Sequence, residues 1–253
     1  MPAERGCVYF IGAGPGDPEL ITVKGRRLLR SAELVLFAGS LVPRQLLTGC
    51  LQDADIRDSA NMTLEQTHAC LLKGYADNKR IVRLHTGDPS LYGTILEQMR
   101  LLAEDGIPFR IVPGVSSAFA AAADAGVSFT IPEDRQTLII TRASGRTAVP
   151  ETQDLDRLAE SRAAMAIYLS GTMARKVQKK LMRGGLEPET RVVIGHKVGW
   201  PDGQVRSCTL AKMVATASEM KISGQAVFLV LPSKKENRRS RLYAPEFNHK
   251  FRN

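Results

Sequence analysis

Short apolar runs of strand length alternate along this chain with longer stretches in which apolar residues recur every three or four positions. In the first half, this pattern predicts strands at 8–12, 34–38, 81–86 and 109–112 and helices at 22–31, 63–75, 91–103 and 116–125. Thr22 is a suitable N-cap for the first helix, and Gly106 ends the third. Strands that alternate with helices predict a mostly parallel sheet with covering helices.

A second alternating series follows a break at 127–136, which contains Pro132 and several charged residues. Strands are predicted at 137–141, 164–169, 192–196 and 226–231, with helices at 173–183 and 210–217. The break is interpreted as a linker, with an ordinary loop as the alternative. The predicted fold class is therefore α/β, with two α/β domains in tandem at 1–133 and 134–233, followed by a basic tail at 234–253.

The composition is that of a folded globular protein. The 253 residues are 43% hydrophobic and 24% charged, which argues against wholesale disorder. No apolar run approaches the roughly 20 residues needed to cross a bilayer, so no membrane association is expected. The first apolar run, 7–11, is too short for the core of a signal peptide, so a cytoplasmic location is expected.

Cysteine and histidine are too scattered to indicate a metal centre. The four cysteines have no paired spacing, and their ordinary interpretation is buried, reduced thiols in a cytosolic protein. The four histidines form no metal-ligating motif, so no metal site is expected.

The net charge of +9 is spread unevenly. A charged run at 234–239 is typical of a solvated, mobile tail. Arginines elsewhere keep the body basic too, and a basic body suits a polyanionic partner. Charge alone does not choose between nucleic acid and a small polycarboxylate.

The first predicted strand runs into a glycine-rich turn at 12–18. A dinucleotide site is disfavoured, because Asp17 occupies the position of the third fingerprint glycine and Pro15 removes a backbone donor. No phosphate-binding G-x-x-x-x-G-K-[ST] motif is present. The open backbone suits a ligand without phosphates, and a purely structural tight turn is the alternative.

Two further turns, at 87–90 and 113–118, also lie between a predicted strand and a helix. The carboxyl ends of parallel strands are where α/β folds bind ligands, so three such turns outline a binding cleft. Taken alone, Asp88 is as well explained as a helix cap.

Three segments in this order resemble the tetrapyrrole methylase family, which includes the uroporphyrinogen-III and precorrin methyltransferases and diphthine synthase: VYFIGAGPGDPELITVKG at 8–25, GDPSLYG at 87–93 and PGVSSAFAAAADAG at 113–126. The resemblance covers nearly the whole chain. Within the family, FAGSLVP at 37–43, QTLIITR at 136–142, IYLSGTM at 167–173 and SRLYAPEF at 240–247 are similar to the branch that methylates precorrin-4 at C11. The last segment favours a tail that packs on the body.

The resemblance implies an enzyme of cobalamin biosynthesis that converts precorrin-4 to precorrin-5, with S-adenosyl-L-methionine as methyl donor and S-adenosyl-L-homocysteine as product. It also implies a homodimer and an active-site cleft between the domains. The family's donor pocket carries over onto Pro15, Gly87, Asp88, Pro89, Tyr92, Ser117, Ala118, Leu169, Met173, Val198, Gly199 and Ala226. Core packing is the alternative for Leu169 and Ala226, and gap filling for Met173.

The acceptor in this interpretation carries many carboxylates, which arginine binds bidentately. The candidate arginines follow predicted strand ends or lie in loops: Arg44, Arg135, Arg142 and Arg146. For each of them, a solvated surface position is the alternative. A reduced macrocycle has nucleophilic carbons, so a strong base is not required for attack, although a base could help to remove a proton. Asp17 and Asp88 are near the expected cleft, but helix capping or turn stabilisation explains them as well, so the catalytic residue is left unassigned.

Three other functions stay open. An RNA methyltransferase would suit the charge, but only 6% of the residues are aromatic and AGSLVP stands where that branch of the family has an acidic motif, so no nucleic-acid partner is expected. A uroporphyrinogen-III methyltransferase is the nearest alternative within the family. A non-catalytic binding protein is the third. The sequence does not indicate whether a precorrin substrate carries cobalt.

Overall fold

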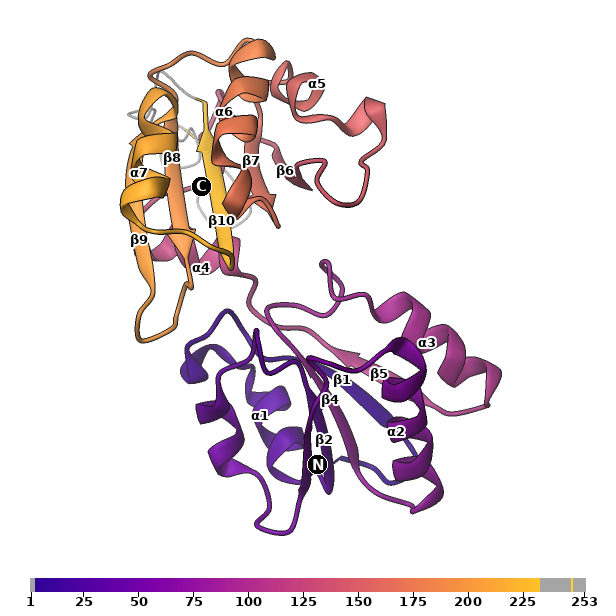
Figure 1. Cartoon of the computed structure of the whole chain (residues 1–253). Coiled ribbons are helices and arrows are strands. Elements are labelled where there is room, and N and C mark those ends of the chain that lie inside the picture. Colours follow the sequence, from indigo (N-terminus) through magenta and orange to yellow (C-terminus); the bar gives the residue numbers. More distant parts are fainter. Residues whose placement is uncertain (1–2, 233–246, 248–253) are drawn as a thin grey trace. The chain divides into compact units, whose positions relative to one another are not determined.

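The computed structural model describes residues 3–232 and residue 247, which form two compact units (Figure 1). Of the described residues, the first unit comprises 3–120 together with 197–202, and the second comprises 121–196, 203–232 and 247. The predicted tail at 234–253 lies outside the described residues, apart from Phe247. Among the helices that are described, none is both long and apolar enough to span a membrane.

The first unit is built on a five-stranded parallel sheet. Its strands are β1 (Val8–Gly12), β2 (Leu34–Phe37), β3 (Asp55–Asp58), β4 (Ile81–His85) and β5 (Phe109–Val112), in the order β3-β2-β4-β1-β5. Parallel pairing places the carboxyl ends of all five strands at one edge, where the three predicted turns begin. The predicted parallel sheet is confirmed.

Helices cover both faces of this sheet, as Figure 1 shows. They are α1 (Val23–Arg30), α2 (Leu64–Ala76) and α3 (Ile95–Glu104). The next helix, α4 (Ser117–Asp124), begins in the first unit and ends in the second. Thr22 caps α1 as predicted, because its hydroxyl accepts a hydrogen bond from the Gly25 N–H at 3.1 Å. One apolar core packs α1 against the side of Ile11, and another packs α2 and α3 against the side of Phe10.

The second unit contains a mixed sheet. Its strands are β6 (Leu138–Arg142), β7 (Ala164–Tyr168), β8 (Arg191–His196), β9 (Gln204–Thr209) and β10 (Ala226–Leu231), in the order β6-β7-β10-β8-β9. Only β6 and β7 are parallel, and the other pairs are antiparallel. The helices α5 (Leu155–Ala159), α6 (Ala174–Arg183) and α7 (Met213–Glu219) pack on an apolar core with these strands. The α/β class is thus confirmed for both units.

Three elements were not predicted: β3, β9 and α5. Both strands lie at a sheet edge, where polar and charged side chains replace the apolar run that marks a central strand. Helix α3 begins at Ile95, not at 91 as predicted, because Tyr92 and Thr94 have left-handed backbones with φ of 54° and 52°.

The break at 127–136 is a folded loop of the second unit. Ile131 and Arg135 pair as an antiparallel bridge, and both are buried. The alternative of an ordinary loop therefore describes this segment better than an exposed linker does.

Candidate functional site

The three glycine turns meet at the carboxyl edge of the first sheet. A Cβ atom placed on Gly12 would lie 2.6 Å from the backbone of Gly114 and from the Gly87 carbonyl oxygen, so the three chains touch without room for a side chain. A Cβ on Gly114 would overlap the same carbonyl. These glycines are therefore required by close approach of the backbones, whatever the turns bind.

Main-chain hydrogen bonds join the first turn to the second. The Gly87 N–H donates to the Gly14 carbonyl at 2.8 Å, the Gly14 N–H donates to the Gly87 carbonyl at 3.3 Å, and the Ala13 N–H donates to the His85 carbonyl at 2.7 Å. Beyond the parallel strands β1 and β4, Gly14 and Gly87 thus form an isolated antiparallel bridge, which fixes the relative position of the two turns.

Asp88 joins the second turn to the third. Its carboxylate accepts a hydrogen bond from the Ser90 N–H at 2.8 Å and another from the Gly114 N–H at 2.9 Å. It does not cap α3, which begins seven residues later at Ile95. Asp88 is accordingly a clamp within the site, and both of its oxygens already serve backbone donors.

Space is open beside Gly87. Its φ is 60°, and an added Cβ would meet only the Ser116 Cα, at 3.9 Å. Tyr92 is 41% exposed, whereas Pro15, Pro89 and Ala118 are buried in the packing beneath the turns. The open space in this part of the molecule thus lies beside Gly87 and Tyr92.

The loop 197–202 belongs to the first unit and packs on the first turn. A Cβ on Gly199 would lie 2.6 Å from the Asp17 nitrogen, and one on Gly16 would lie 2.8 Å from both the Val198 carbonyl oxygen and the Trp200 indole nitrogen. The structure therefore brings the predicted Val198 and Gly199 to the turn that contains Pro15. Trp200, the only tryptophan in the chain, was missed by the sequence analysis.

Three predicted residues gather at one edge of the second sheet. Pairing of Phe228 with Ile167 brings the start of β10, at Ala226, beside the end of β7. Leu169 follows β7 with a φ of 51° and is 65% exposed, so it is not the core residue of the alternative interpretation.

Met173 and Ala226 each lie close to a glycine. A Cβ on Gly171 would lie 3.1 Å from the Ala226 Cβ, and a Cβ on Gly145 would lie 3.2 Å from the Met173 Cε. Both side chains are partly buried, so a packing role explains them as well as ligand contact does.

The four candidate arginines have different surroundings. Arg135 is 4% exposed and donates to the carbonyls of Phe129 and Ser128 at 2.7 and 3.0 Å. Arg142 donates to the carbonyls of Thr147 and Ala148 at 3.0 and 2.7 Å, which folds the following loop back on β6. Arg44 and Arg146 are exposed.

His85 is the last residue of β4, just before the second turn, and its surroundings disfavour its protonated form. It is 6% exposed, packs with a ring-centroid distance of 5.9 Å to Phe10, and its Nε2 has no hydrogen-bond partner among the described residues. Burial and, secondarily, the nearby Arg83 lower the pKa of His85 to about 3. The imidazole is therefore neutral at ordinary pH. Within the part of the chain that is described, no group of metal-ligating side chains occurs.

The first two turns follow parallel strands, are joined by hydrogen bonds and leave open space beside Gly87. This is the arrangement of a ligand-binding α/β protein. Residues 7–214 match the family Tetrapyrrole (Corrin/Porphyrin) Methylases, and the chain belongs to this family. The resemblance found in the sequence is thereby confirmed.

Individual proteins similar to this chain give a more specific comparison than the family does. The chain is 42% identical to "Cobalt-precorrin-4 C(11)-methyltransferase" of Priestia megaterium, over 97% of each chain. It is also 42% identical to "Precorrin-4 C(11)-methyltransferase" of Pseudomonas aeruginosa, over 97% of this chain and 98% of that protein.

Solved structures agree with the fold. A cobalt precorrin-4 methyltransferase is similar with a TM-score of 0.87 and 43% identity, covering 89% of this chain and 95% of that one. A uroporphyrin-III C-methyl transferase from Thermus thermophilus, in complex with S-adenyl homocysteine, has a TM-score of 0.73 and 25% identity, covering 88% and 91%.

Proposed function

We propose that this chain is an S-adenosylmethionine-dependent methyltransferase of cobalamin biosynthesis that methylates C11 of precorrin-4, or of its cobalt form, to give a precorrin-5. The observation that carries the proposal is the 42% identity, over nearly the full length of both chains, to proteins named for this reaction. S-adenosylhomocysteine is the expected second product.

The turns of the first unit fit this donor. They contain no Lys or Arg at 12–18, 87–90 or 113–118, which suits a cationic sulfonium, and the space beside Gly87 is open. The residues proposed to hold the donor in the first unit are Pro15, Gly87, Asp88, Pro89, Tyr92, Ser117, Ala118, Val198 and Gly199. The family resemblance adds Leu169, Met173 and Ala226 of the second unit to the proposed contacts.

The bound donor supplies an activated methyl group on its cationic sulfur, so this chain has to orient the reactants and keep water away. The interlocked turns provide a closely packed backbone surface, since Gly12 and Gly114 lie against each other and against the Gly87 carbonyl. Asp88 holds two turns in register through its backbone contacts. Burial lowers the pKa of His85 to about 3, so its imidazole is a weak base and is not assigned as the one that removes a proton.

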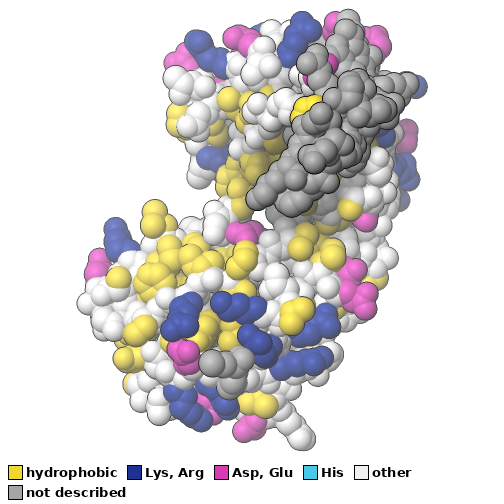
Figure 2. All heavy atoms as spheres, turned by 180° about the vertical axis from the view of Figure 1, so that it is seen from behind, with side chains coloured by type: hydrophobic (Ala, Val, Ile, Leu, Met, Phe, Trp, Pro, Cys, Tyr) yellow, Lys and Arg dark blue, Asp and Glu magenta, His cyan; other side chains and the backbone are white. Residues whose placement is uncertain are grey.

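The acceptor's carboxylates are proposed to meet exposed arginines. Figure 2 shows that Lys and Arg side chains gather on one face of the first unit, in keeping with the net charge of +9. Arg44 and Arg146 are the better candidates of the four, because the guanidinium groups of Arg135 and Arg142 donate to backbone carbonyls of their own loops.

We further propose that the protein acts in the cytoplasm as a homodimer, on a small-molecule acceptor and without a nucleic-acid partner. The family resemblance supports the dimer. Sedimentation at micromolar concentration is expected to give twice the mass of 27.7 kDa. A purely monomeric boundary would contradict the dimer and leave the proposed reaction standing.

The reaction is tested with labelled S-adenosylmethionine, offering precorrin-4, cobalt-precorrin-4, uroporphyrinogen III and ribosomal RNA separately. One new methyl group at C11, located by mass spectrometry and NMR, is the expected result, and the preferred precorrin shows whether cobalt is required. Transfer only to uroporphyrinogen III would favour the function of the Thermus thermophilus relative. Transfer only to RNA would overturn the acceptor class.

A further inference from the structure

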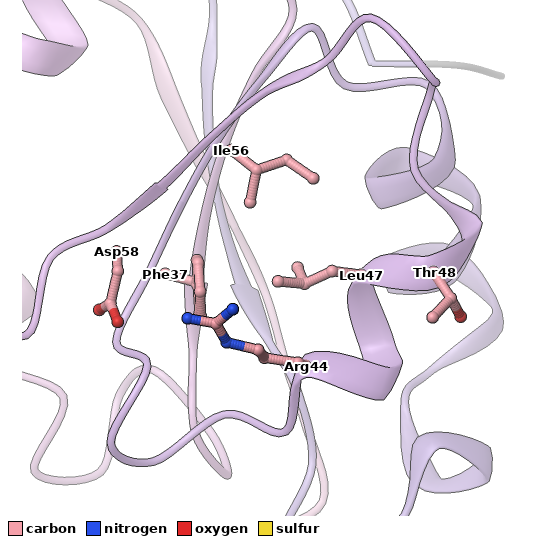
Figure 3. A pocket seen from close by; sticks show the side chains of 6 residues that line it. All are labelled: Phe37, Arg44, Leu47, Thr48, Ile56 and Asp58. Atoms are coloured by element: carbon pink, nitrogen blue, oxygen red, sulfur yellow. The ribbon is translucent and has the colours of Figure 1, made fainter.

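A cavity of about 450 Å³ opens beside the edge strand of the first unit, apart from the glycine turns (Figure 3). It lies between β3, the end of β2 and a short helix, η2 (Arg44–Gly49). Its lining is Phe37, Arg44, Leu47, Thr48, Ile56 and Asp58. This volume is within the range of small-molecule sites in proteins, roughly 300–1,000 Å³.

The walls of the cavity are apolar and partly exposed. Phe37 is buried at 3% exposure, whereas Ile56 is 40% exposed on a short, otherwise polar edge strand. Leu47 faces them from η2, and Figure 3 shows Ile56 and Leu47 on opposite sides of the cavity. Such walls offer contact to the flat, apolar part of a ligand.

One end of the cavity carries a fixed carboxylate. Asp58 accepts hydrogen bonds from the Gly39 N–H at 2.8 Å and the Ala60 N–H at 2.9 Å, and these bonds are the main cause of its lowered pKa. Its oxygens occupy the space that a Cβ on Gly39 would need. The Asp58 charge is therefore permanent and already balanced by backbone donors.

The cavity lining contains one cation, Arg44, beside this carboxylate. Arg44 reaches across Phe37 toward Asp58 in Figure 3, yet it forms no ion pair within 4.0 Å among the described residues. The buried Arg83 also acts electrostatically on Asp58, and its own hydrogen bonds go to the neutral Ser59 and Gln98. Because the Asp58 carboxylate already accepts hydrogen bonds from two backbone N–H groups, the Arg44 guanidinium is the group in the lining that can bind an anion.

The cavity lies near the carboxyl ends of the strands, as the glycine turns do. Asp58 pairs with Phe37, which pairs with Leu84 of β4, just ahead of the second turn. Neighbouring strands are about 4.8 Å apart, so two steps across the sheet give roughly 10 Å. A macrocycle with its side chains can bridge that distance.

We propose that this cavity is a subsite for one carboxylate-bearing edge of the tetrapyrrole acceptor. Arg44 binds the acceptor carboxylate through its paired N–H groups, and the pyrrole edge rests against Phe37, Leu47 and Ile56. Asp58 is a positioning residue that fixes the 38–43 loop through Gly39. The inference rests on the proposed function, because it takes the acceptor class from it.

The test is steady-state kinetics of Arg44→Gln with the precorrin accepted by the wild type. The KM for the acceptor is expected to rise about tenfold or more, with kcat and the Kd for S-adenosylhomocysteine within about twofold of wild type. Arg44→Lys is expected to recover part of the loss, since it restores the charge without the fork. Arg100→Gln, an exposed arginine on α3 paired with Glu104, is the matched control.

Ile56→Glu provides an independent variant, because it places a second carboxylate in the cavity while altering an exposed side chain. Like Arg44→Gln, it is expected to raise the KM for the acceptor. An unchanged KM in both variants, with an active wild type, overturns the subsite and leaves the proposed function intact.

Binding of uroporphyrin III, a stable polycarboxylate, tests the cavity without turnover. Titration by fluorescence quenching is expected to show about tenfold weaker binding to Arg44→Gln than to wild type, and equal affinity overturns the subsite. A wild type that transfers no methyl group to any precorrin, yet shows this tenfold difference, overturns the proposed function and supports the subsite.

Discussion

In the first unit, the candidate site is built from backbone: glycines that touch one another, main-chain hydrogen bonds and a carboxylate that serves two N–H groups. In the second unit, the candidate residues contribute side chains, with Leu169 exposed and Met173 and Ala226 partly buried around small glycines. A backbone site tolerates almost no substitution at its contact points. A side-chain site allows its members to vary while the fold persists.

The largest effect is expected at Gly114. Its added Cβ in Gly114→Ala would overlap the Gly87 carbonyl and Gly12 Cα, so the turns must separate. We expect a loss of roughly 3 kcal/mol or more in unfolding free energy and no detectable binding of S-adenosylhomocysteine. Thermal denaturation and calorimetry measure the two quantities.

Gly224→Ala is the matched control, because nothing lies within 4 Å of an added Cβ there and its φ is not left-handed. Its stability is expected to stay within about 0.5 kcal/mol of wild type. If Gly114→Ala and Gly224→Ala lost the same stability, the close backbone contacts at Gly114 would not distinguish it from a glycine outside the site.

Gly87→Arg separates binding from folding. The position has a φ of 60° but open space, so the fold should lose only about 1–2 kcal/mol for the left-handed backbone. The long side chain would fill the proposed donor space with positive charge, and S-adenosylhomocysteine affinity is expected to fall at least a hundredfold in calorimetry. Gly87→Ala, which adds the strain without the bulk, shows how much of that loss comes from strain.

Asp88→Ala removes the clamp between the second and third turns. Two backbone N–H groups lose a charged acceptor, so we expect roughly 1–3 kcal/mol lower stability and about tenfold weaker S-adenosylhomocysteine binding. Asp88→Asn keeps one acceptor oxygen and should lose less of both. If the Kd does not change in either variant, Asp88 is a structural residue only.

The smallest effect on folding is expected at Leu169. Leu169→Ala removes a side chain that is 65% exposed, so stability should change by about 0.5 kcal/mol or less. If the side chain contacts the donor, S-adenosylhomocysteine binding weakens about three- to tenfold in the same titrations. A large fall in melting temperature would show that Leu169 supports the fold after all.

Apolar strands were predictable and polar strands were not. The buried strands at 8–12 and 226–231 have the predicted bounds, since buried strands are written as continuous apolar runs. The edge strand Asp55–Asp58 is charged at three of its four positions, and its pairing is decided by β2 beside it. That information is tertiary, and local periodicity does not contain it.

The candidate site also has parts that could be predicted from the sequence and parts that could not. The three glycine turns could be located in the sequence, because strand-turn-helix order places them at one sheet edge. The Asp88 bond to Gly114 spans 26 residues, and the cavity at Arg44 depends on the unpredicted β3. The only local signal for Trp200 is its rarity in the chain, so its packing on Gly16 could not be predicted.

The loop 197–202 has a consequence for synthesis. It completes the first unit, although three strands of the second sheet, β6, β7 and β8, lie between residue 120 and this loop in the sequence. During translation, the first unit therefore waits, with the Gly16 side of its first turn uncovered, until the ribosome has passed residue 202. Folding from the amino terminus, the usual order for domains, cannot finish this unit on its own. We therefore expect the packing of this loop on the first turn to be a late step in the folding of the amino-terminal unit.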